Sequence, residues 1–279
     1  LSSYFARVPI RIHTFTGLIF PSKTGILQKL LILMDKLLCF FATNIYPEGE
    51  GVKKDLIGHR ITNKPLKIIA NGNVNGIDIN FFDSKLFTKN KQKTLRSSLG
   101  INESDFVFIF VGRLVGDKGI NELVDAFWKL KADSPKKGSF KLLLVGPFEN
   151  KLDPLKPNVI EEISCNEDII AVGFQEDVRP YFAISNVLVF PSYREGFPNV
   201  VIQAGAMGLP SIVSNINGCN EIIVNSENGI IVPAKNTDAL KKEMLRLYED
   251  TNLFLKLRFN SRSYVINRYK QDLVWRAIL

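Results

Sequence analysis

The chain has 279 residues, of which 46% are hydrophobic and 23% are charged, and this balance excludes a largely disordered protein. Its two histidines and three widely spaced cysteines, Cys39, Cys165 and Cys219, form neither a zinc-binding nor a disulfide pattern, which favours a reducing, cytoplasmic compartment. The formal net charge of +8 indicates an anionic partner without identifying it.

The first 64 residues hold nine basic residues against four acidic ones. The basic residues are Arg7, Arg11, Lys23, Lys29, Lys36, Lys53, Lys54, Arg60 and Lys64. This excess suits a phosphate-bearing lipid or the inner face of an anionic membrane. Nucleic acid is excluded as a partner, because no recognition motif accompanies the charge. A basic surface that only keeps the protein soluble remains an alternative.

Residues 26–42 are strongly apolar, but Lys29, Asp35 and Lys36 interrupt them. A membrane-spanning helix needs about 20 residues with few charges, so the segment predicts a mostly buried helix or one resting on a membrane surface. A strand is predicted over residues 8–13, and a strand followed by a linker over residues 65–83. We therefore expect residues 1–75 to form a partial N-terminal lobe.

From residue 105 onward, short β-rich runs alternate with helical patterns. The runs are continuously apolar, as expected of strands with both faces covered. The β-rich runs are residues 106–111, 141–145, 168–172, 186–190, 211–213 and 229–232, and the helical patterns are residues 120–131, 178–184, 200–207 and 238–248. This order predicts an α/β fold with a doubly wound parallel sheet of about six strands over residues 76–265. Residues 266–279 are predicted to form a helix that packs back on the N-terminal lobe.

Glycine and polar residues follow the predicted strands. In open α/β sheets, ligands bind at the carboxyl ends of the strands, and glycine there lets a ligand approach the backbone. The pairs that follow the strands are Gly112-Arg113, Gly146-Pro147, Gly173-Phe174, Pro191-Ser192 and Ser214-Asn215. The sequence therefore predicts a ligand pocket at this edge of the sheet.

Two clusters indicate what the pocket binds. Residues 112–119 place two cations, Arg113 and Lys118, at the start of a helix, which suits a diphosphate, although a solvated basic loop remains an alternative. Residues 191–204 place Glu195 on a loop before a helix whose first backbone amides could meet a phosphate. Gln203 lies about two turns into that helix. Glu195 could alternatively act only as a capping or ion-pair residue.

At these residues the chain resembles the family 4 retaining glycosyltransferases of the GT-B fold, which use a nucleoside-diphosphate sugar as donor. The resemblance covers roughly residues 71–248. It rests on Arg113 with Lys118, on the run from Glu195 to Gln203, and on the motifs at residues 206–210, 218–222 and 228–229. It implies a two-lobed GT-B enzyme of bacterial capsule or lipopolysaccharide assembly, in which the N-terminal lobe binds the acceptor.

The resemblance also implies roles for single residues. The catalytic residues would be Glu195, Arg113, Lys118 and His13, with Arg113 and Lys118 on the donor diphosphate and His13 facing the donor sugar. The donor-binding residues would be Arg113, Lys118, Phe174, Glu195, Gly196, Phe197, Asn199, Val200 and Gln203. Phe174 would lie by the nucleobase. Gln203 replaces a family glutamate that usually binds the ribose, so we expect a weaker or altered ribose contact.

The implied reaction needs no metal and no cofactor, with a UDP- or GDP-linked sugar as donor and a lipid-linked or oligosaccharide acceptor. Two alternatives remain: a GT-B nucleotide-sugar epimerase and a non-catalytic nucleotide-sugar-binding fragment. An oxidoreductase is excluded, because no GxGxxG turn follows a predicted strand. We also expect a fragment or shortened relative, with an intact donor lobe, an incomplete acceptor lobe and an exposed apolar face over residues 26–42.

Overall fold

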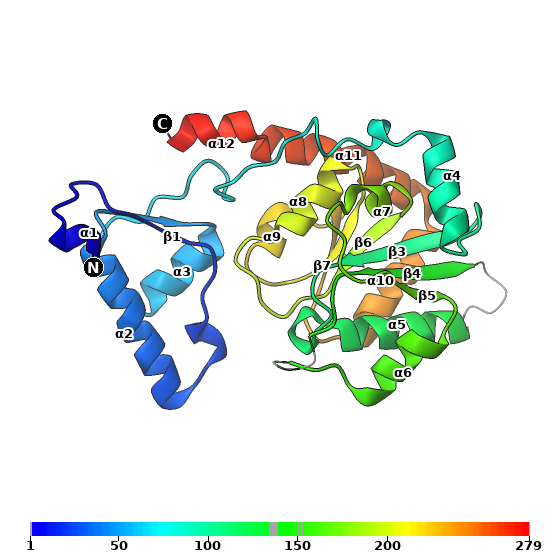
Figure 1. The fold of residues 1–279 in the computed structure, drawn as a ribbon, viewed down its shortest axis with the longest axis horizontal. Helices are drawn as coiled ribbons and strands as arrows, with labels where there is room; N and C mark the ends of the chain where they lie inside the picture. Colours follow the sequence, from blue (N-terminus) through cyan, green and yellow to red (C-terminus); the bar gives the residue numbers. More distant parts are fainter. Residues whose placement is uncertain (1, 134–138, 150, 152, 279) are drawn as a thin grey trace.

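A computed structural model describes residues 2–133, 139–149, 151 and 153–278, which form a smaller first lobe and a larger second lobe (Figure 1). The first lobe contains α1 (Ser2–Phe5), β1 (Ile12–Phe15), η1 (Phe20–Ser22), α2 (Gly25–Phe41), β2 (Asn44–Pro47) and α3 (Glu50–Gly58). Strands β1 and β2 are parallel, with Ile12 opposite Asn44. Phe20 and Leu56 are fully buried in this lobe's own core.

Two predicted strands of the first lobe were placed wrongly. The strand predicted at residues 8–13 begins four residues later, at Ile12, because Pro9 has no backbone N–H to donate to a ladder. The strand predicted after Pro65 is not a regular one. Within the described residues it makes only isolated parallel bridges, of which the one between Ile45 and Leu66 joins it to β2.

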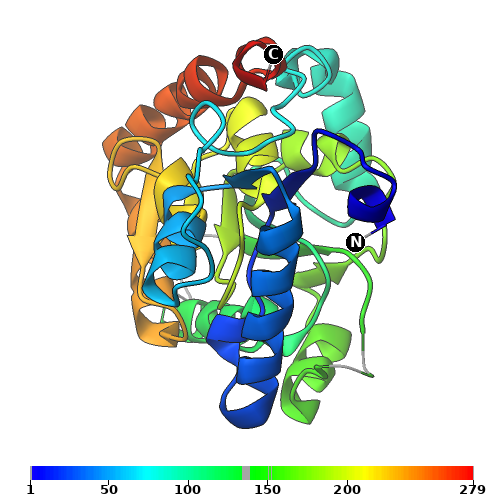
Figure 2. The same cartoon turned by 90° about the vertical axis from the view of Figure 1, so that its left-hand side faces the viewer.

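Helix α2 is far more exposed than a core helix. It buries only Cys39, whereas Ile26 is 87% exposed and Phe40 is 68% exposed. Figure 2 shows α2 on the outer side of the first lobe, turned away from the second lobe. The predicted exposed apolar face is therefore present, and the alternative of a mostly buried helix is wrong. No helix within the described parts of the chain is long and apolar enough to cross a membrane.

The second lobe is built on a sheet of six parallel strands. They are β3 (Phe106–Val111), β4 (Phe140–Val145), β5 (Ile169–Ala171), β6 (Val187–Phe190), β7 (Ser211–Ser214) and β8 (Gly229–Val232). Their order is β5-β4-β3-β6-β7-β8, so the direction of winding reverses between β3 and β6, where Phe110 stacks on Phe190. The predicted doubly wound sheet is confirmed, with each strand within two residues of its predicted bounds.

Helices cover both faces of this sheet, which explains the apolar strands. One face carries α5 (Ile120–Asp133), α6 (Pro157–Cys165) and α10 (Thr237–Glu249), and the other carries α7 (Arg179–Ala183), α8 (Asn199–Ala206) and α11 (Thr251–Tyr269) (Figure 1). The remaining elements are η2 (Ser84–Leu86), α4 (Lys89–Ser98), η3 (Gly116–Lys118), α9 (Cys219–Ile222) and α12 (Gln271–Ile278). The sheet residues Phe108, Leu143 and Leu188 are fully buried.

The end of α11 contacts the segment that connects the lobes. The backbone N–H of Ile77 donates to the carbonyl of Tyr269 at 2.8 Å, and the side-chain amide of Asn71 donates to the carbonyl of Arg268 at 3.3 Å. The predicted packing of residues 266–279 on the first lobe stays a prediction, as do the lobe boundaries at residues 75 and 265.

Candidate active site

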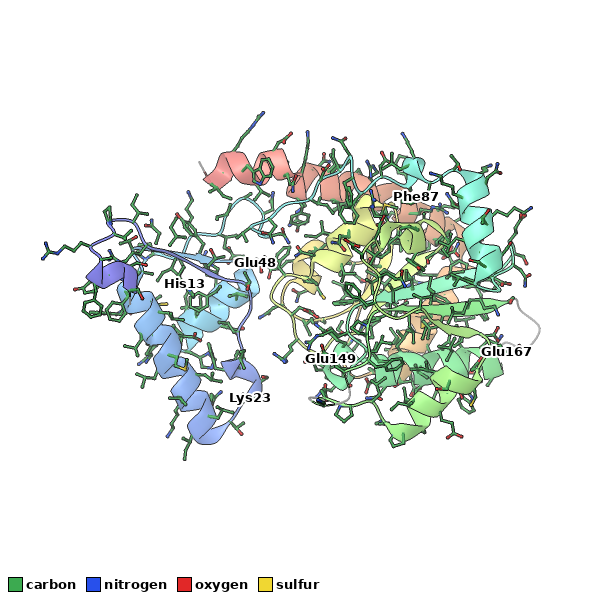
Figure 3. All side chains as sticks on the ribbon, in the orientation of Figure 1. His13, Lys23, Glu48, Phe87, Glu149 and Glu167 are labelled. Atoms are coloured by element: carbon green, nitrogen blue, oxygen red, sulfur yellow. The ribbon has the colours of Figure 1, made fainter. Side chains whose placement is uncertain are left out.

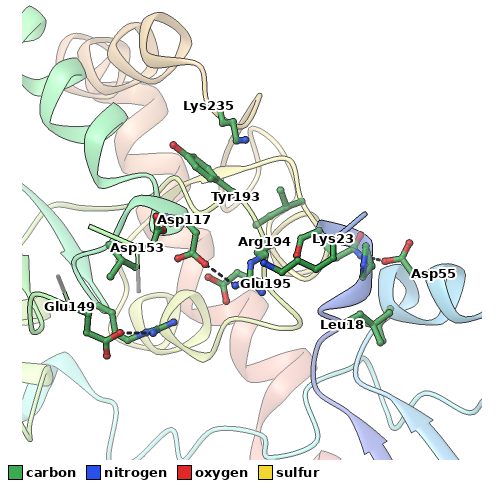
Figure 4. A pocket seen from close by; sticks show the side chains of 17 residues that line it. Leu18, Lys23, Asp55, Asp117, Glu149, Asp153, Tyr193, Arg194, Glu195 and Lys235 are labelled. Atoms are coloured by element: carbon green, nitrogen blue, oxygen red, sulfur yellow. Dashed lines mark hydrogen bonds and ion pairs between the residues drawn. The ribbon is translucent and has the colours of Figure 1, made fainter. Parts of the chain in front are cut away.

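A cavity of about 780 Å³ lies between the lobes (Figure 4). The first lobe contributes Leu18, Lys23 and Asp55 to its walls, and the second lobe contributes residues that follow β3, β4, β6 and β7. Among the latter are Arg113, Asp117, Glu149, Asp153, Tyr193, Arg194, Glu195 and Asn217. The cavity therefore lies at the predicted edge of the sheet, beside the point where the winding reverses.

Arg113 follows β3 and reaches the cavity as a half-exposed side chain. Its guanidinium donates to Glu149, 2.7 Å away on the loop after β4. A Cβ on Gly146 would overlap the carbonyl of Gly112. The loops after β3 and β4 can therefore approach each other only because residue 146 is a glycine. Arginine binds carboxylate and phosphate through the same planar fork, so Glu149 occupies a position that suits an anionic ligand.

Lys118 and Glu195 bring the two sequence clusters together. The Lys118 ammonium lies 2.5 Å from the Glu195 carboxylate, and the side chains are only 17% and 15% exposed. The loops that carry them are tied by backbone and side-chain bonds: Tyr193 N–H donates to the carbonyl of Asp117 at 2.8 Å, and Arg194 pairs with the Asp117 carboxylate at 2.9 Å. Glu195 and Arg194 thus line the cavity, and Lys118 lies behind them as the partner of Glu195.

Helix α8 starts beside this wall, and its first residues also contact the first lobe. A Cβ on Gly196 would overlap the carbonyl of Thr16, so the two backbones pack directly on each other. The side-chain carbonyl of Asn199 accepts from the amide of Asn73, which is fully buried, at 2.6 Å. Phe197 is 5% exposed and packs edge-on against Tyr269.

Four backbone amides lie just before and at the start of α8, next to Glu195. Within the described residues, no protein acceptor is found for the amides of Gly196, Phe197, Asn199 and Val200. Amides at a helix N-terminus favour negative charge, which is the reason for expecting a contact to a sugar phosphate here. Their role in donor binding stays a prediction.

Two of the predicted site residues, Arg113 and Glu195, line the cavity. The others do not: His13, Lys118, Phe174, Gly196, Phe197, Asn199, Val200 and Gln203. His13 lies in the middle of β1 and packs edge-on against Phe15, at 4.5 Å between ring centroids, inside the first lobe (Figure 3). Burial lowers the pKa of His13, and nearby Asp35 opposes this shift. Because β1 continues to Phe15, His13 does not lie at the end of its strand, and its predicted role beside the donor sugar stays a prediction. Phe174 is 74% exposed after the edge strand β5, and Gln203 is half-buried in α8.

Sequence reasoning missed the cavity residues that come from other loops. Glu149 lies just beyond the predicted strand end at Gly146-Pro147, and Arg194 adjoins Glu195 inside the second cluster, so the neighbouring sequence could have indicated both. No nearby sequence pattern indicates Asp55 of the first lobe as a cavity residue. Its carboxylate accepts from Asn217 of the second lobe at 2.9 Å, over 162 residues of sequence.

Glu48 is a buried carboxyl on the side of the first lobe that faces the second (Figure 3). It is 4% exposed, and its backbone carbonyl accepts from Asn73 N–H. Burial raises the pKa of Glu48 to about 7, and a hydrogen bond from the backbone of Val74 acts in the opposite direction. The carboxyl is therefore partly protonated near neutral pH.

Glu48→Gln should stabilise the protein at high pH and have little effect at low pH. Because the folded-state pKa is raised, the folded protein binds the extra proton, and stability falls as pH rises from about 4.5 through about 7. Glutamine mimics the neutral form, so we expect the unfolding free energy of the variant to exceed the wild type by about 2 kcal/mol at pH 8.5. Urea unfolding at pH 4.5 and 8.5 measures this, and an equal effect at both pH values would contradict it.

Known proteins resemble this chain in sequence and in fold. The model of the family "Glycosyl transferases group 1" matches residues 91–265. The capsular polysaccharide biosynthesis glycosyltransferase CapM of Staphylococcus aureus is 30% identical over 284 residues, which cover 100% of this chain and 71% of CapM. An Escherichia coli UDP-Gal:α-D-GlcNAc-diphosphoundecaprenol α-1,3-galactosyltransferase is 27% identical over 272 residues, covering 96% of this chain and 67% of that enzyme.

Among solved structures, HepE of Anabaena in complex with UDP superposes with a TM-score of 0.83 at 20% identity, over 99% of this chain and 72% of HepE. At this identity the likeness shows the fold alone, and it confirms the predicted GT-B fold. The family model covers more than half of the chain, and its span contains Arg113, Lys118 and Glu195. The chain therefore belongs to the glycosyl transferases group 1 family and is a glycosyltransferase.

Proposed function

We propose that the protein moves a sugar from a UDP- or GDP-linked donor to a hydroxyl of a lipid-linked saccharide, with retention of configuration at the anomeric carbon. The observation that carries this proposal is the approach of Lys118 to Glu195 at 2.5 Å, on two loops beside Arg113. Two cations suit a diphosphate, and an adjoining carboxylate suits sugar hydroxyls. In support, the E. coli relative is named for a UDP-sugar donor and a diphosphoundecaprenol-linked acceptor.

In the proposed reaction, the bond between the anomeric carbon and the diphosphate oxygen breaks, and the acceptor oxygen bonds to the same face of that carbon. The acceptor proton passes to the departing diphosphate. Arg113, Lys118 and the amides that precede α8 stabilise the charge that develops on the leaving group. Glu195 accepts from the donor sugar hydroxyls, Phe174 lies by the nucleobase and Gln203 by the ribose. The proposal includes transfer without a metal, at a rate that EDTA leaves unchanged.

A donor screen followed by product analysis tests the proposal. UDP- and GDP-linked sugars are first ranked by the rise that they cause in the unfolding temperature, since a ligand that binds only the folded state stabilises it. The best donor is then incubated with a short-chain lipid diphosphate saccharide. A glycosylated lipid supports the proposal, whereas an epimerised donor, or binding without any product, would replace it with one of the alternatives.

Replacing Arg113 or Lys118 with alanine should weaken binding of the nucleoside diphosphate by about 1.5–3 kcal/mol, the range for a hydrogen bond to a charged group. The nucleoside alone should bind as before, because it lacks the phosphates. Calorimetry with UDP and uridine, or with GDP and guanosine, measures both affinities. Equal losses for nucleoside and diphosphate would show that these cations hold the protein together and do not bind phosphate.

We also place the enzyme in the cytoplasm, at the inner face of the membrane. The exposed apolar residues of α2, Ile26, Leu30 and Leu37 among them, lie in the lobe with the basic excess, and an anionic bilayer surface attracts both features. Ile26→Ser/Leu30→Ser removes two apolar side chains that the bilayer would bury. We therefore expect the fraction of protein that sediments with phosphatidylglycerol vesicles to fall at least three-fold. Equal sedimentation of the wild type and the variant would contradict this placement.

A further inference from the structure

Helix α3 of the first lobe begins without a capping side chain of its own. Its N-cap residue is Gly49, which has no side chain to accept from the first backbone amides of the helix. Such amides need an acceptor, and an aspartate or serine at this position would usually provide one. In this protein the acceptor comes from the other lobe.

The acceptor is the carboxylate of Glu221. Its two oxygens accept from the backbone amides of Glu50 at 2.6 Å and Gly51 at 3.0 Å, across 171 and 170 residues of sequence. The same carboxylate also accepts from the amide of Gly218, at 3.3 Å, where α9 of its own lobe begins. One side chain therefore caps two helices that belong to different lobes.

The glycines at the start of α3 are shaped to this contact. A Cβ on Gly49 would lie 2.8 Å from both Glu221 oxygens, and a Cβ on Gly51 would lie 2.8 Å from the Cβ of Asn217. Any side chain at Gly49 would thus push the carboxylate off the amides. Both glycines allow close approach of the second lobe. For Gly51, which lies inside α3, this comes at the expense of helix propensity, a cost of about 0.5–1 kcal/mol.

The contact lies next to the cavity. Asn217, four residues before Glu221, lines the cavity and donates to Asp55 of α3, which lines it too. Withdrawal of Glu221 would therefore release the wall that α3 provides. Glu221 does not itself line the cavity. Its backbone carbonyl accepts a hydrogen bond from the Tyr269 hydroxyl at 3.3 Å, which connects Glu221 to α11.

From this geometry we infer that Glu221 is a positioning residue: its carboxylate caps α3 in trans and holds the first lobe in the orientation that closes the cavity. The inference rests on the proposed function only where sugar transfer is the readout, because the lobe orientation can be measured without any substrate. It assigns Glu221 a part in acceptor transfer and none in nucleotide binding.

The first experiment measures the distance between the lobes. Cys165 is exposed on α6, whereas Cys39 and Cys219 are buried, so Lys54→Cys on α3 gives a pair of accessible thiols for spin labels. We expect one narrow distance distribution with Glu221 present, a broad one with Glu221→Ala, and a narrow one again with Glu221→Gln, whose amide oxygen can still accept. An unchanged narrow distribution in Glu221→Ala would overturn the inference, whether or not the protein transfers sugar.

Two glycine variants test the same contact from the other lobe. Gly49→Ala should broaden the distribution as Glu221→Ala does, and the double variant should be no broader than either, because both remove one interaction. Gly58→Ala, at the far end of α3 with open space around it, is the matched control and should keep the narrow distribution. Broadening by Gly58→Ala equal to that by Gly49→Ala would attribute the effect to the helix and overturn the inference.

Transfer kinetics complete the test. Glu221→Ala should lower kcat for transfer at least ten-fold, Glu221→Gln should recover most of that loss, and the Kd for UDP should change less than two-fold in both. Glu161→Ala, an exposed glutamate on α6, serves as the control. A loss of UDP affinity equal to the loss of transfer would mean that Glu221 supports the donor site, contrary to the inference.

Discussion

Glu195→Gln is expected to reduce sugar transfer by about 100- to 1000-fold, while the affinity for the free nucleoside diphosphate changes less than about two-fold. Glu195 is 15% exposed, and its carboxylate neutralises Lys118 at 2.5 Å. Glutamine keeps the shape of the side chain but removes the charge that orients the sugar hydroxyls. A diphosphate without a sugar makes no use of those hydroxyl contacts. Steady-state kinetics and calorimetry with UDP or GDP measure the two effects.

Glu149→Gln is the matched control for this prediction. Glu149 is also a glutamate in an ion pair at the cavity, with Arg113 at 2.7 Å, but it lies on the loop after β4. The control should lower transfer less than ten-fold, because a nucleotide diphosphate can take the place of Glu149 beside Arg113. If Glu195→Gln instead abolished nucleotide binding, Glu195 would be a ribose or structural residue and its assignment to the sugar would be wrong.

Gly196→Ala is expected to abolish transfer and to lower the unfolding temperature by several degrees. A methyl group at Gly196 would overlap the carbonyl of Thr16 and lie 2.9 Å from the Cα of Gly17. These are backbone atoms, which cannot rotate away as a side chain can, so the first lobe must move or the loop before α8 must distort. Overpacking of this kind usually costs about 1–3 kcal/mol. Thermal unfolding and a transfer assay measure the result.

Gly17→Ala provides the control from the opposite side of the same contact. A Cβ on Gly17 would meet Gly196 at 3.6 Å, which is an ordinary van der Waals distance. This variant should keep both its unfolding temperature and its activity. Equal damage from the two substitutions would show that the contact responds to any added methyl group, and that the backbone overlap at Gly196 is not the cause.

The second lobe could be predicted from sequence because its information is local. The strands β3 to β8 are mostly apolar runs, and glycine or a polar residue follows several of them closely; burial on both faces requires the apolar runs. The same rule placed Arg113, Lys118 and Glu195 at one edge of the sheet. The contact between Lys118 and Glu195 then follows from the sheet order, which sets β3 beside β6.

The first lobe could not be predicted as well, because its elements depend on partners far away in the sequence. The four-residue strands β1 and β2 carry too short a pattern to fix their bounds, and the error in β1 put His13 at a strand end that the structure gives to Phe15. No local pattern reveals that Glu221 caps α3 or that Asn73 bonds Asn199, since each pair joins two lobes. The contacts between the lobes are the part of the site that the sequence did not reveal.

The backbone contact at Gly196 has a consequence for how such enzymes can diverge. A side chain that clashes with another side chain can be rescued by a second substitution, and Gly49 against Glu221 is a pair of that kind. A clash with the carbonyl of Thr16 has no such rescue, because every residue at position 16 carries the same carbonyl. Selection can then only remove variants at position 196, so no compensating pair of mutations would accumulate there. Methods that infer contacts from correlated substitutions would therefore overlook one of the tightest contacts between the lobes.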